Sequence, residues 1–251
     1  MKLWISKLLK RKSSSDLIRS ITAIRNSVSA ILRIRRETQN RFQLIIVGTA
    51  WCIVPRRILV TAFHILNNGQ PRNPGDNFFA FFVPNNGPTI WHTPVVNFLL
   101  EDPNVDMAIL EIDHARLQAL QIPAIPITFK SVPDGERVVT CGFPAPRITR
   151  ANVDANGNWQ GGELFLISHA NEGIISGQYD VNGRRTYELN VGWHHGESGG
   201  PILRIKPLSA VAIMQRYRNI ETPHGVVSGP HQGTSLQAIE DRLREFEIQI
   251  V

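Results

Sequence analysis

The 251-residue chain contains only two cysteines, Cys52 and Cys141, which are too few for a disulfide framework. Both lie inside apolar runs, so we expect two buried and unreactive thiols. No run of eighteen apolar residues is present, which excludes an ordinary transmembrane helix. Residues 1–12 lack the uninterrupted apolar stretch of a secretory signal. These absences favour a cytoplasmic or membrane-peripheral location, and organelle targeting by the N-terminal segment stays open.

The chain also lacks an even distribution of charge. Its formal net charge is +6 and its isoelectric point is about 9.7, values that by themselves suggest an acidic partner such as nucleic acid or a membrane surface. Ten of the 27 Lys and Arg residues but only one of the 21 acidic residues lie in 1–36, so this segment carries +9 and the rest of the chain −3. The rest shows no basic stripe interleaved with aromatic residues, so we predict no nucleic-acid partner.

The basic segment is predicted to be a leader over residues 1–40, with one amphipathic helix at 16–37. Ser13, Ser14, Ser15 and Asp16 offer N-cap residues. Apolar residues then recur in steps of four and three and form one stripe: Leu17, Ile21, Ile24, Val28 and Ile31. Residues 1–36 can therefore lie on an anionic membrane, pair with a partner helix, direct the chain to an organelle, or pack their stripe on the rest of the protein.

After residue 41 the pattern becomes that of an all-β protein. Short apolar runs rich in β-branched and aromatic residues alternate with turn clusters of Asn, Gly, Pro and Asp. The first set of runs lies in 41–114, at 42–47, 50–54, 58–62, 78–83 and 107–112. A proline-containing connector follows at 115–132. A second set lies in 133–233, at 137–142, 164–169, 173–177, 186–191, 201–205 and 210–215.

We read these runs as two sets of about six strands each. Two six-stranded antiparallel barrels would leave no exposed edge strand. The chain then ends in a predicted helix over 234–247, because a capping signal at Thr234 and Ser235 precedes apolar residues at helical spacing.

Three short stretches carry the candidate chemistry. Val60-Thr61-Ala62-Phe63-His64 places a histidine at the end of an apolar strand, and Asp106 opens another strand. Gly196-Glu197-Ser198-Gly199-Gly200-Pro201 places a serine in a glycine-rich turn. Serine needs a base because its hydroxyl is a poor nucleophile at neutral pH, and the base needs a carboxylate to fix its tautomer. His64, Asp106 and Ser198 follow one another in the order of chymotrypsin-type enzymes, at separations of 42 and 92 residues.

These stretches resemble the His, Asp and Ser signatures of the chymotrypsin-like (trypsin-superfamily) serine peptidases. The closer likeness is to the microbial-type trypsin-like peptidase domain, also found in high-temperature-requirement proteases. Further matching stretches lie at 48–51, 135–144 and 173–177, and the similarity covers about 42–245. The resemblance implies a peptidase domain over 41–251. It also implies a serine endopeptidase that acts on polypeptides through an acyl-enzyme, without a metal or an organic cofactor.

The resemblance also implies the roles of particular residues. Ser198 would be the nucleophile, His64 the general base and then the acid, and Asp106 the group that orients His64. The backbone N–H groups of Gly196 and Ser198 would form the oxyanion hole. The base of the primary pocket would lie at Gly192, six residues before the serine. Its walls would be formed by Trp193, His194, His195, Gln215, Arg216 and Tyr217.

Some features depart from the family pattern. Glu197 stands where digestive enzymes have an Asp that pairs with a newly cut N-terminus, and residues 45–48 lie too close to His64 to be that terminus. We therefore expect no zymogen switch of that type. Because the sequence stops at 251, we expect no peptide-binding PDZ domain like that of high-temperature-requirement proteases.

Substrate preference and some roles stay open. Arg216 or a protonated histidine would favour an acidic side chain, whereas Trp193 would close the pocket to all but small ones. His194 and His195 are adjacent in a predicted strand and point to opposite faces, which favours pocket lining over a metal site. Alternative functions are hydrolysis of esters by the same residues, and a catalytically weak binding or scaffolding module tethered by its N-terminal helix.

Overall fold

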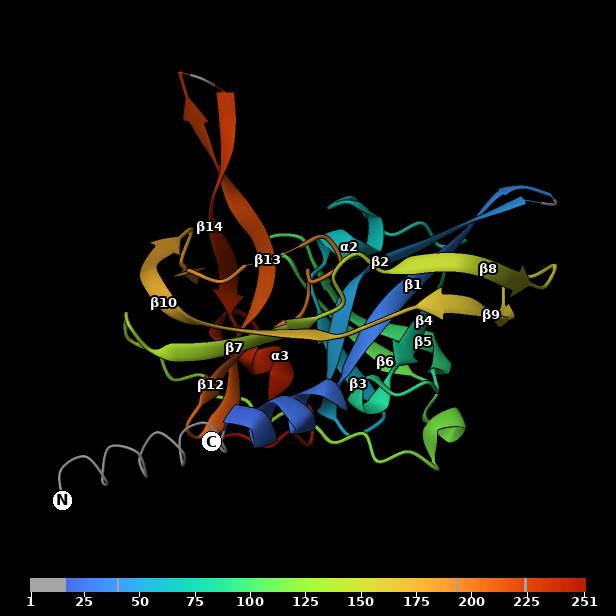
Figure 1. Cartoon of the computed structure of the whole chain (residues 1–251), viewed down its shortest axis with the longest axis horizontal. Coiled ribbons are helices and arrows are strands. Elements are labelled where there is room, and N and C mark those ends of the chain that lie inside the picture. The colour runs from blue at the N-terminus through green and yellow to red at the C-terminus, as the bar shows by residue number, and fades with distance from the viewer. Residues whose placement is uncertain (1–16, 40, 193, 224) are drawn as a thin grey trace.

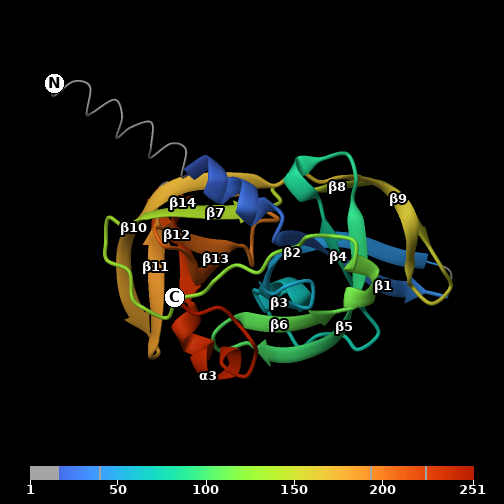
Figure 2. The same ribbon diagram turned by 90° about the horizontal axis from the view of Figure 1, so that it is seen from below.

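The computed structural model describes residues 17–39, 41–192, 194–223 and 225–251. Two closed six-stranded antiparallel barrels lie side by side in it (Figure 1 and Figure 2). The predicted all-β fold with two such barrels is therefore confirmed. Cys52 on the second strand and Cys141 on the seventh are free, buried thiols, as the apolar runs around them predicted.

The first barrel has the strand order β1-β2-β3-β6-β5-β4, and β1 also pairs with β4 to close it. Its strands are β1 (Val28–Thr38), β2 (Arg41–Val54), β3 (Ile58–Thr61), β4 (Asn77–Phe82), β5 (Trp91–Asp102) and β6 (Met107–Ile112). Short helical turns lie between or after them: α2 (His64–Asn67), η1 (Pro84–Asn86) and η2 (His114–Leu117). The barrel interior is filled by aliphatic and aromatic side chains that include Ile31, Leu59 and Phe82.

The prediction of one helix over 16–37 is wrong. Residues 17–25 are helical, but Val28–Thr38 forms β1, so the first barrel begins at residue 28 rather than 41. Strand β1 is buried on both faces: Ala30, Leu32 and Ile34 pack into a core cluster shared by the two barrels, and Ile31 packs inside the first barrel. A strand with two buried faces has no alternating pattern, so its apolar residues also matched helical spacing.

The apolar stripe of the N-terminal segment is therefore used inside the protein. Ile24 is 1% exposed, and Leu17 and Ile21 pack against the shared core cluster. Figure 2 shows the helix of residues 17–25 lying along the barrels. In the described part of the chain this supports the predicted packing of the stripe on the body of the protein. No helix described there is long and apolar enough to cross a membrane.

The second barrel has the order β10-β11-β14-β13-β12-β7, closed by pairing of β7 with β10. Its strands are β7 (Arg137–Gly142), β10 (His169–Val181), β11 (Arg184–Leu189), β12 (Pro201–Ile205), β13 (Leu208–Thr222) and β14 (Gly225–Ser235). β13 and β14 extend as a long hairpin away from the barrel (Figure 1). A separate hairpin of β8 (Arg147–Val153) and β9 (Trp159–Phe165) packs beside β2.

The C-terminal segment differs from the prediction, because its helical parts are shorter than the single helix expected. Instead of one helix over 234–247, β14 continues to Ser235 and is followed by η3 (Leu236–Ile239) and α3 (Glu240–Leu243). The capping signal is real, because the Ser235 side chain accepts a hydrogen bond from the backbone N–H of Gln237 at 3.2 Å. Strand β5 was not predicted either, since Pro94 and several polar residues interrupt its apolar pattern.

Candidate active site

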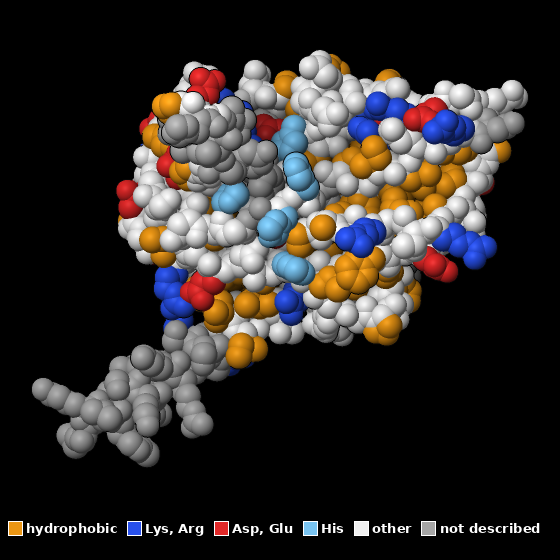
Figure 3. Space-filling model, turned by 45° about the horizontal axis from the view of Figure 1, so that its top comes forward, with side chains coloured by type: hydrophobic (Ala, Val, Ile, Leu, Met, Phe, Trp, Pro, Cys, Tyr) orange, Lys and Arg blue, Asp and Glu red, His pale blue; other side chains and the backbone are white. Residues whose placement is uncertain are grey.

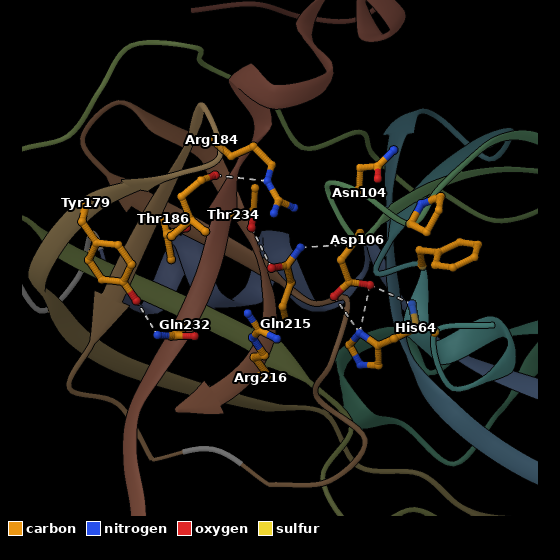
Figure 4. Close-up of a pocket in the computed structure, with 14 residues that line it drawn as sticks. His64, Asn104, Asp106, Tyr179, Arg184, Thr186, Gln215, Arg216, Gln232 and Thr234 are labelled. Atoms are coloured by element: carbon orange, nitrogen blue, oxygen red, sulfur yellow. Dashed lines mark hydrogen bonds and ion pairs between the residues drawn. The ribbon is translucent and has the colours of Figure 1, made fainter. Parts of the chain in front are cut away.

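His64 and Asp106 meet where strands of the first barrel end. His64 opens the short helix α2 after β3, and Asp106 directly precedes β6. Nδ1 of His64 lies 2.9 Å from Oδ2 and 3.1 Å from Oδ1 of Asp106, and the backbone N–H of His64 donates to Oδ1 at 2.8 Å. Figure 4 shows the imidazole facing the carboxylate. The two side chains keep 33% and 26% of their surface exposed, so the pair is accessible to a ligand.

Gln215 holds the Asp106 loop in place from the other barrel. Asp106 has φ +55°, a left-handed conformation that is uncommon for residues other than glycine. Nε2 of Gln215, on β13, donates to the carbonyl oxygens of Val105 at 2.8 Å and Asp106 at 3.1 Å, and Oε1 accepts from Oγ1 of Thr234 at 2.6 Å. The side chain predicted as a pocket wall therefore bridges the two barrels at the backbone of the loop that carries Asp106.

Ser198 lies in the predicted glycine turn, and two positions of that turn require glycine. Gly196 has φ +102°, and a Cβ there would lie 2.2 Å from the carbonyl oxygen of Phe143. Gly199 has φ +86°, and a Cβ there would lie 2.2 Å from the carbonyl oxygen of Thr49. Thr49, on β2, also binds the turn: its N–H donates to the Ser198 carbonyl at 2.8 Å and its hydroxyl to the Gly196 carbonyl at 2.7 Å.

The Ser198 hydroxyl has a resting partner other than His64. It donates to the carbonyl oxygen of Gln215 at 3.3 Å, and among the described residues no hydrogen bond joins it to His64. In the same part of the chain, neither the N–H of Gly196 nor that of Ser198 donates to a protein acceptor. These two N–H groups are therefore available to an oxygen atom of a ligand.

Glu197 lies between Gly196 and Ser198 in the serine turn, and its carboxyl group is buried. The residue is 1% exposed. Burial raises the pKa of its carboxyl to about 7, although hydrogen bonds from the backbone of His194 and the side chain of Asn171 act in the opposite direction. The structure gives it partners other than a chain terminus, and residues 45–48, which superficially resemble such a terminus, lie within β2.

An open cleft of about 670 Å³ adjoins the His64–Asp106 pair, between the two barrels (Figure 4). Of the predicted primary-pocket residues, Gln215 and Arg216 line it, whereas Gly192, His194 and His195 do not. Trp193 and the side chain of Tyr217 lie outside the described residues. The far wall comes from the second barrel and was not predicted from the sequence; it includes Tyr179, Val181, Arg184, Thr186, Gln232 and Thr234.

Histidine side chains gather along the middle of one face of the molecule (Figure 3). His194 and His231 lie within electrostatic range, because His194 lowers the pKa of His231 in addition to the larger effect of burial. In the described ranges no group of three or more His, Cys, Asp or Glu side chains is placed to hold a metal ion. The donors needed for a structural or catalytic zinc site are not brought together there.

Two closed antiparallel barrels, with a His–Asp pair and a serine turn at their junction, define the chymotrypsin-like class of fold. The chain belongs to the trypsin-like peptidase domain family, whose model matches residues 48–213, more than half of the sequence. The predicted resemblance is therefore confirmed at the level of the family.

A solved structure described as "HtrA-type protease AlgW with decapeptide" is similar to the chain at a TM-score of 0.60 and 13% sequence identity. The alignment covers 90% of this chain and 66% of that one, so the chain spans about two thirds of the length of its structural relative. Sequence identity this low shows a common fold alone. Comparison with curated proteins gives no match.

Three residues of the site escaped prediction or were given another role. Thr49 was noted only as part of a matching stretch, Asn171 carried no signal, and Gln215 was assigned to a pocket wall. Each of these residues acts through a contact with a residue distant in the sequence, so no local motif indicates its role.

Proposed function

We propose that the protein is a serine endopeptidase in which Ser198, His64 and Asp106 form a catalytic triad. The observation that carries the proposal is the two-point contact of His64 with Asp106 beside an open cleft, with Ser198 held in a glycine turn linked to the same site by Gln215. Membership of the trypsin-like peptidase domain family supports a peptidase activity. Because the proposed nucleophile is a serine, the peptidase would be of the serine type.

The reaction starts when the Ser198 hydroxyl rotates from the Gln215 carbonyl toward His64. Oγ attacks the scissile carbonyl carbon while His64 takes the hydroxyl proton, and Asp106 stabilises the resulting imidazolium. The N–H groups of Gly196 and Ser198 stabilise the negative charge on the carbonyl oxygen, an effect worth about 3–4 kcal/mol per donor in related sites. His64 then protonates the leaving amine, and water hydrolyses the acyl-enzyme by the reverse sequence. No step calls on a metal or an organic cofactor.

The substrate is a polypeptide. The structural relative was solved with a decapeptide, which supports a peptide in the corresponding cleft of this chain. Arg184 and Arg216 line the cleft. Among the described residues that line it, Asp106 is the only carboxylate, and it is paired with His64. This charge balance favours peptides that place an acidic side chain in the cleft, a preference that cleavage of a peptide library would reveal.

Covalent labelling tests the proposal directly. A fluorophosphonate probe should label the wild type at Ser198, and Ser198→Ala should abolish both labelling and peptide cleavage. Labelling of any other serine would appear equally in Ser198→Ala. A wild type that stays unlabelled, or a variant that labels as strongly, contradicts the proposal.

The alternative is a catalytically weak binding or scaffolding module. The specific observation in its favour is the resting hydrogen bond from Ser198 to Gln215 instead of His64. Such a module would bind peptides with similar affinity in the wild type and in Ser198→Ala but cleave none. The apolar stripe of residues 17–31 is not free to bind a membrane or a partner helix, because it packs into the protein.

A further inference from the structure

The hairpin of β10 and β11 turns one of its faces toward the cleft. Asn182 and Gly183 form its turn and have φ +50° and +75°, the left-handed conformations that a two-residue hairpin turn requires. Side chains alternate between the two faces of a strand, so each face of the hairpin carries its own set of residues. The cleft-facing set consists of Tyr179, Val181, Arg184 and Thr186.

The other face of this hairpin carries an arginine whose charge is compensated within the protein. Arg185 lies directly across from Asp180, and its Nε donates to Oδ1 of that carboxylate at 2.8 Å. Its Nη1 donates to Oε1 of Gln178 at 2.9 Å and to Oγ of Ser131 at 3.0 Å. Arg185 therefore finds its partners without a ligand.

The neighbouring Arg184 has no carboxylate partner in the described part of the chain. Its cross-strand neighbour is the apolar Val181, whose carbonyl oxygen accepts a hydrogen bond from Nε of Arg184 at 3.3 Å. Figure 4 shows the guanidinium reaching from the wall of the second barrel into the cleft. The bond made by Nε holds the group there and leaves the two terminal nitrogen atoms to a ligand.

The carboxylates nearest this wall are already engaged. Asp106, the one carboxylate among the described residues that line the cleft, is paired with His64. Glu188 lies on the same strand as Arg184 but does not line the cleft, and its Oε1 accepts a hydrogen bond from the Tyr179 hydroxyl at 3.2 Å. An acidic group of a ligand would therefore balance the charge of Arg184 without competing with a carboxylate of the protein.

The two arginines of the cleft differ in their place relative to the candidate nucleophile. Arg216 directly follows Gln215, whose carbonyl oxygen accepts the Ser198 hydroxyl. Arg184 belongs to a different hairpin, and the cleft that it lines includes His64 but not Ser198. A substrate side chain beside Arg184 is therefore expected to come from a residue near the cleaved bond rather than from the residue whose carbonyl Ser198 attacks.

We propose that Arg184 is a specificity-determining residue that selects an acidic substrate side chain at a position other than the one whose carbonyl is attacked. The inference rests on the proposed function and refines it, because it assigns the acidic preference of the cleft to one residue. The guanidinium donates two parallel hydrogen bonds to the substrate carboxylate, the geometry in which arginine binds carboxylates most strongly. Thr186 lies on the same face of β11 and offers its hydroxyl beside this site.

An exchange of charge tests the assignment. In a peptide that the wild type cleaves, Glu is placed in turn at each position on either side of the cleaved bond, with Gln as the reference. One position other than that of the attacked carbonyl should give a kcat/KM about 10- to 100-fold higher for Glu than for Gln, the value of a hydrogen bond to a charged group. Arg184→Gln should bring this ratio close to one, and Arg184→Glu should reverse the preference in favour of Lys.

Arg185→Gln is the matched control, because it makes the same change at the neighbouring residue on the other face, and it should keep the wild-type ratio. Each ratio compares two peptides on one enzyme, so a partial loss of folded protein cancels. A wild type that prefers Glu at no such position would overturn the inference, as would an Arg184→Gln enzyme that keeps the wild-type ratio. Loss of the ratio in Arg216→Gln alone would assign the preference to Arg216 and overturn it as well.

Binding without turnover separates this inference from the proposed function. Fluorescence anisotropy measures the Kd of the labelled Glu and Gln peptides for Ser198→Ala, which cannot form the acyl-enzyme. The Glu peptide should bind more tightly by about the same factor, and adding Arg184→Gln should remove the difference. A wild type that cleaves no peptide but binds acidic peptides through Arg184 would overturn the proposed function and leave this inference in place. Equal Kd values for the two peptides overturn the inference whatever the activity.

Discussion

Among single residues, Glu197 most clearly connects burial with the pH dependence of folding stability. Its pKa rises from an ordinary 4.5 to about 7 on folding, so the folded state binds more protons between these values and stability falls as pH rises through them. Glu197→Gln cannot titrate. Its free energy of unfolding relative to the wild type should increase by about 3 kcal/mol between pH 4.5 and pH 8.

Urea unfolding of both proteins at the two pH values measures this difference. The Cys141 thiol on β7, which interacts electrostatically with Glu197, and His194, whose backbone N–H binds the carboxylate, are both unchanged in the variant. A difference in unfolding free energy that stays constant from pH 4.5 to pH 8 would mean that Glu197 titrates at its ordinary pKa.

The two thiols give a second prediction at this scale. Desolvation raises the pKa of both Cys52 and Cys141 to about 12, so neither forms the reactive thiolate near neutral pH. The native protein at pH 8 should therefore resist a thiol reagent such as iodoacetamide, and both cysteines should react once guanidinium unfolds it. Mass spectrometry counts the adducts; rapid modification of either cysteine in the native protein would contradict the burial.

Local sequence patterns explain which residues of the candidate site could be predicted from the sequence. His64, Asp106 and Ser198 each sit beside a strand end or a glycine turn, and such local patterns can be read directly. Gln215 and Thr49 act across the barrel junction, through bonds that span 109 and 147 positions of the chain. No pattern of neighbouring residues encodes a contact of that length, so their roles required the folded structure.

At the level of elements, the N-terminal segment shows how one apolar pattern serves two structures. Leu17, Ile21 and Ile24 lie on a helix, whereas Val28 and Ile31 belong to β1. Pairing of β1 with both β2 and β4 completes the barrel, and this tertiary pairing overrides helical spacing. Arg35, one of the basic residues of this segment, binds the buried Asp76, with Nε 2.8 Å from Oδ1.

The packing of the N-terminal helix, residues 17–25, can be tested with one substitution on its buried face and a control substitution on its exposed face. Ile24 is 1% exposed in the shared core cluster, whereas Ile18 is 64% exposed. Ile24→Ala should therefore destabilise the protein by about 2–4 kcal/mol, and Ile18→Ala by less than about 0.5 kcal/mol. Chemical unfolding measures both. Equal, small effects would show that the helix does not pack on the barrels in solution.

In the whole molecule, the candidate site exists only where the two barrels meet. His64 and Asp106 belong to the first barrel and Ser198 to the second, so their alignment depends on bonds between barrels. Thr49 supplies such bonds to the serine turn, and Gln215 supplies them to the backbone carbonyls of Val105 and Asp106. The strand runs predicted both barrels, but how the barrels dock depends on these side chains.

Gln215→Ala tests that junction as a whole. The variant leaves the buried carbonyls of Val105 and Asp106 without their donor, which should cost about 1–3 kcal/mol of stability. It should also lower kcat more than it raises KM, because the Asp106 loop loses its anchor on the second barrel while most of the cleft remains. Thermal unfolding and peptide-cleavage kinetics measure the two effects, with the exposed Gln121→Ala as the control. A Gln215→Ala enzyme that is destabilised but cleaves at the wild-type rate would show that this bridge holds the barrels together without aligning the triad.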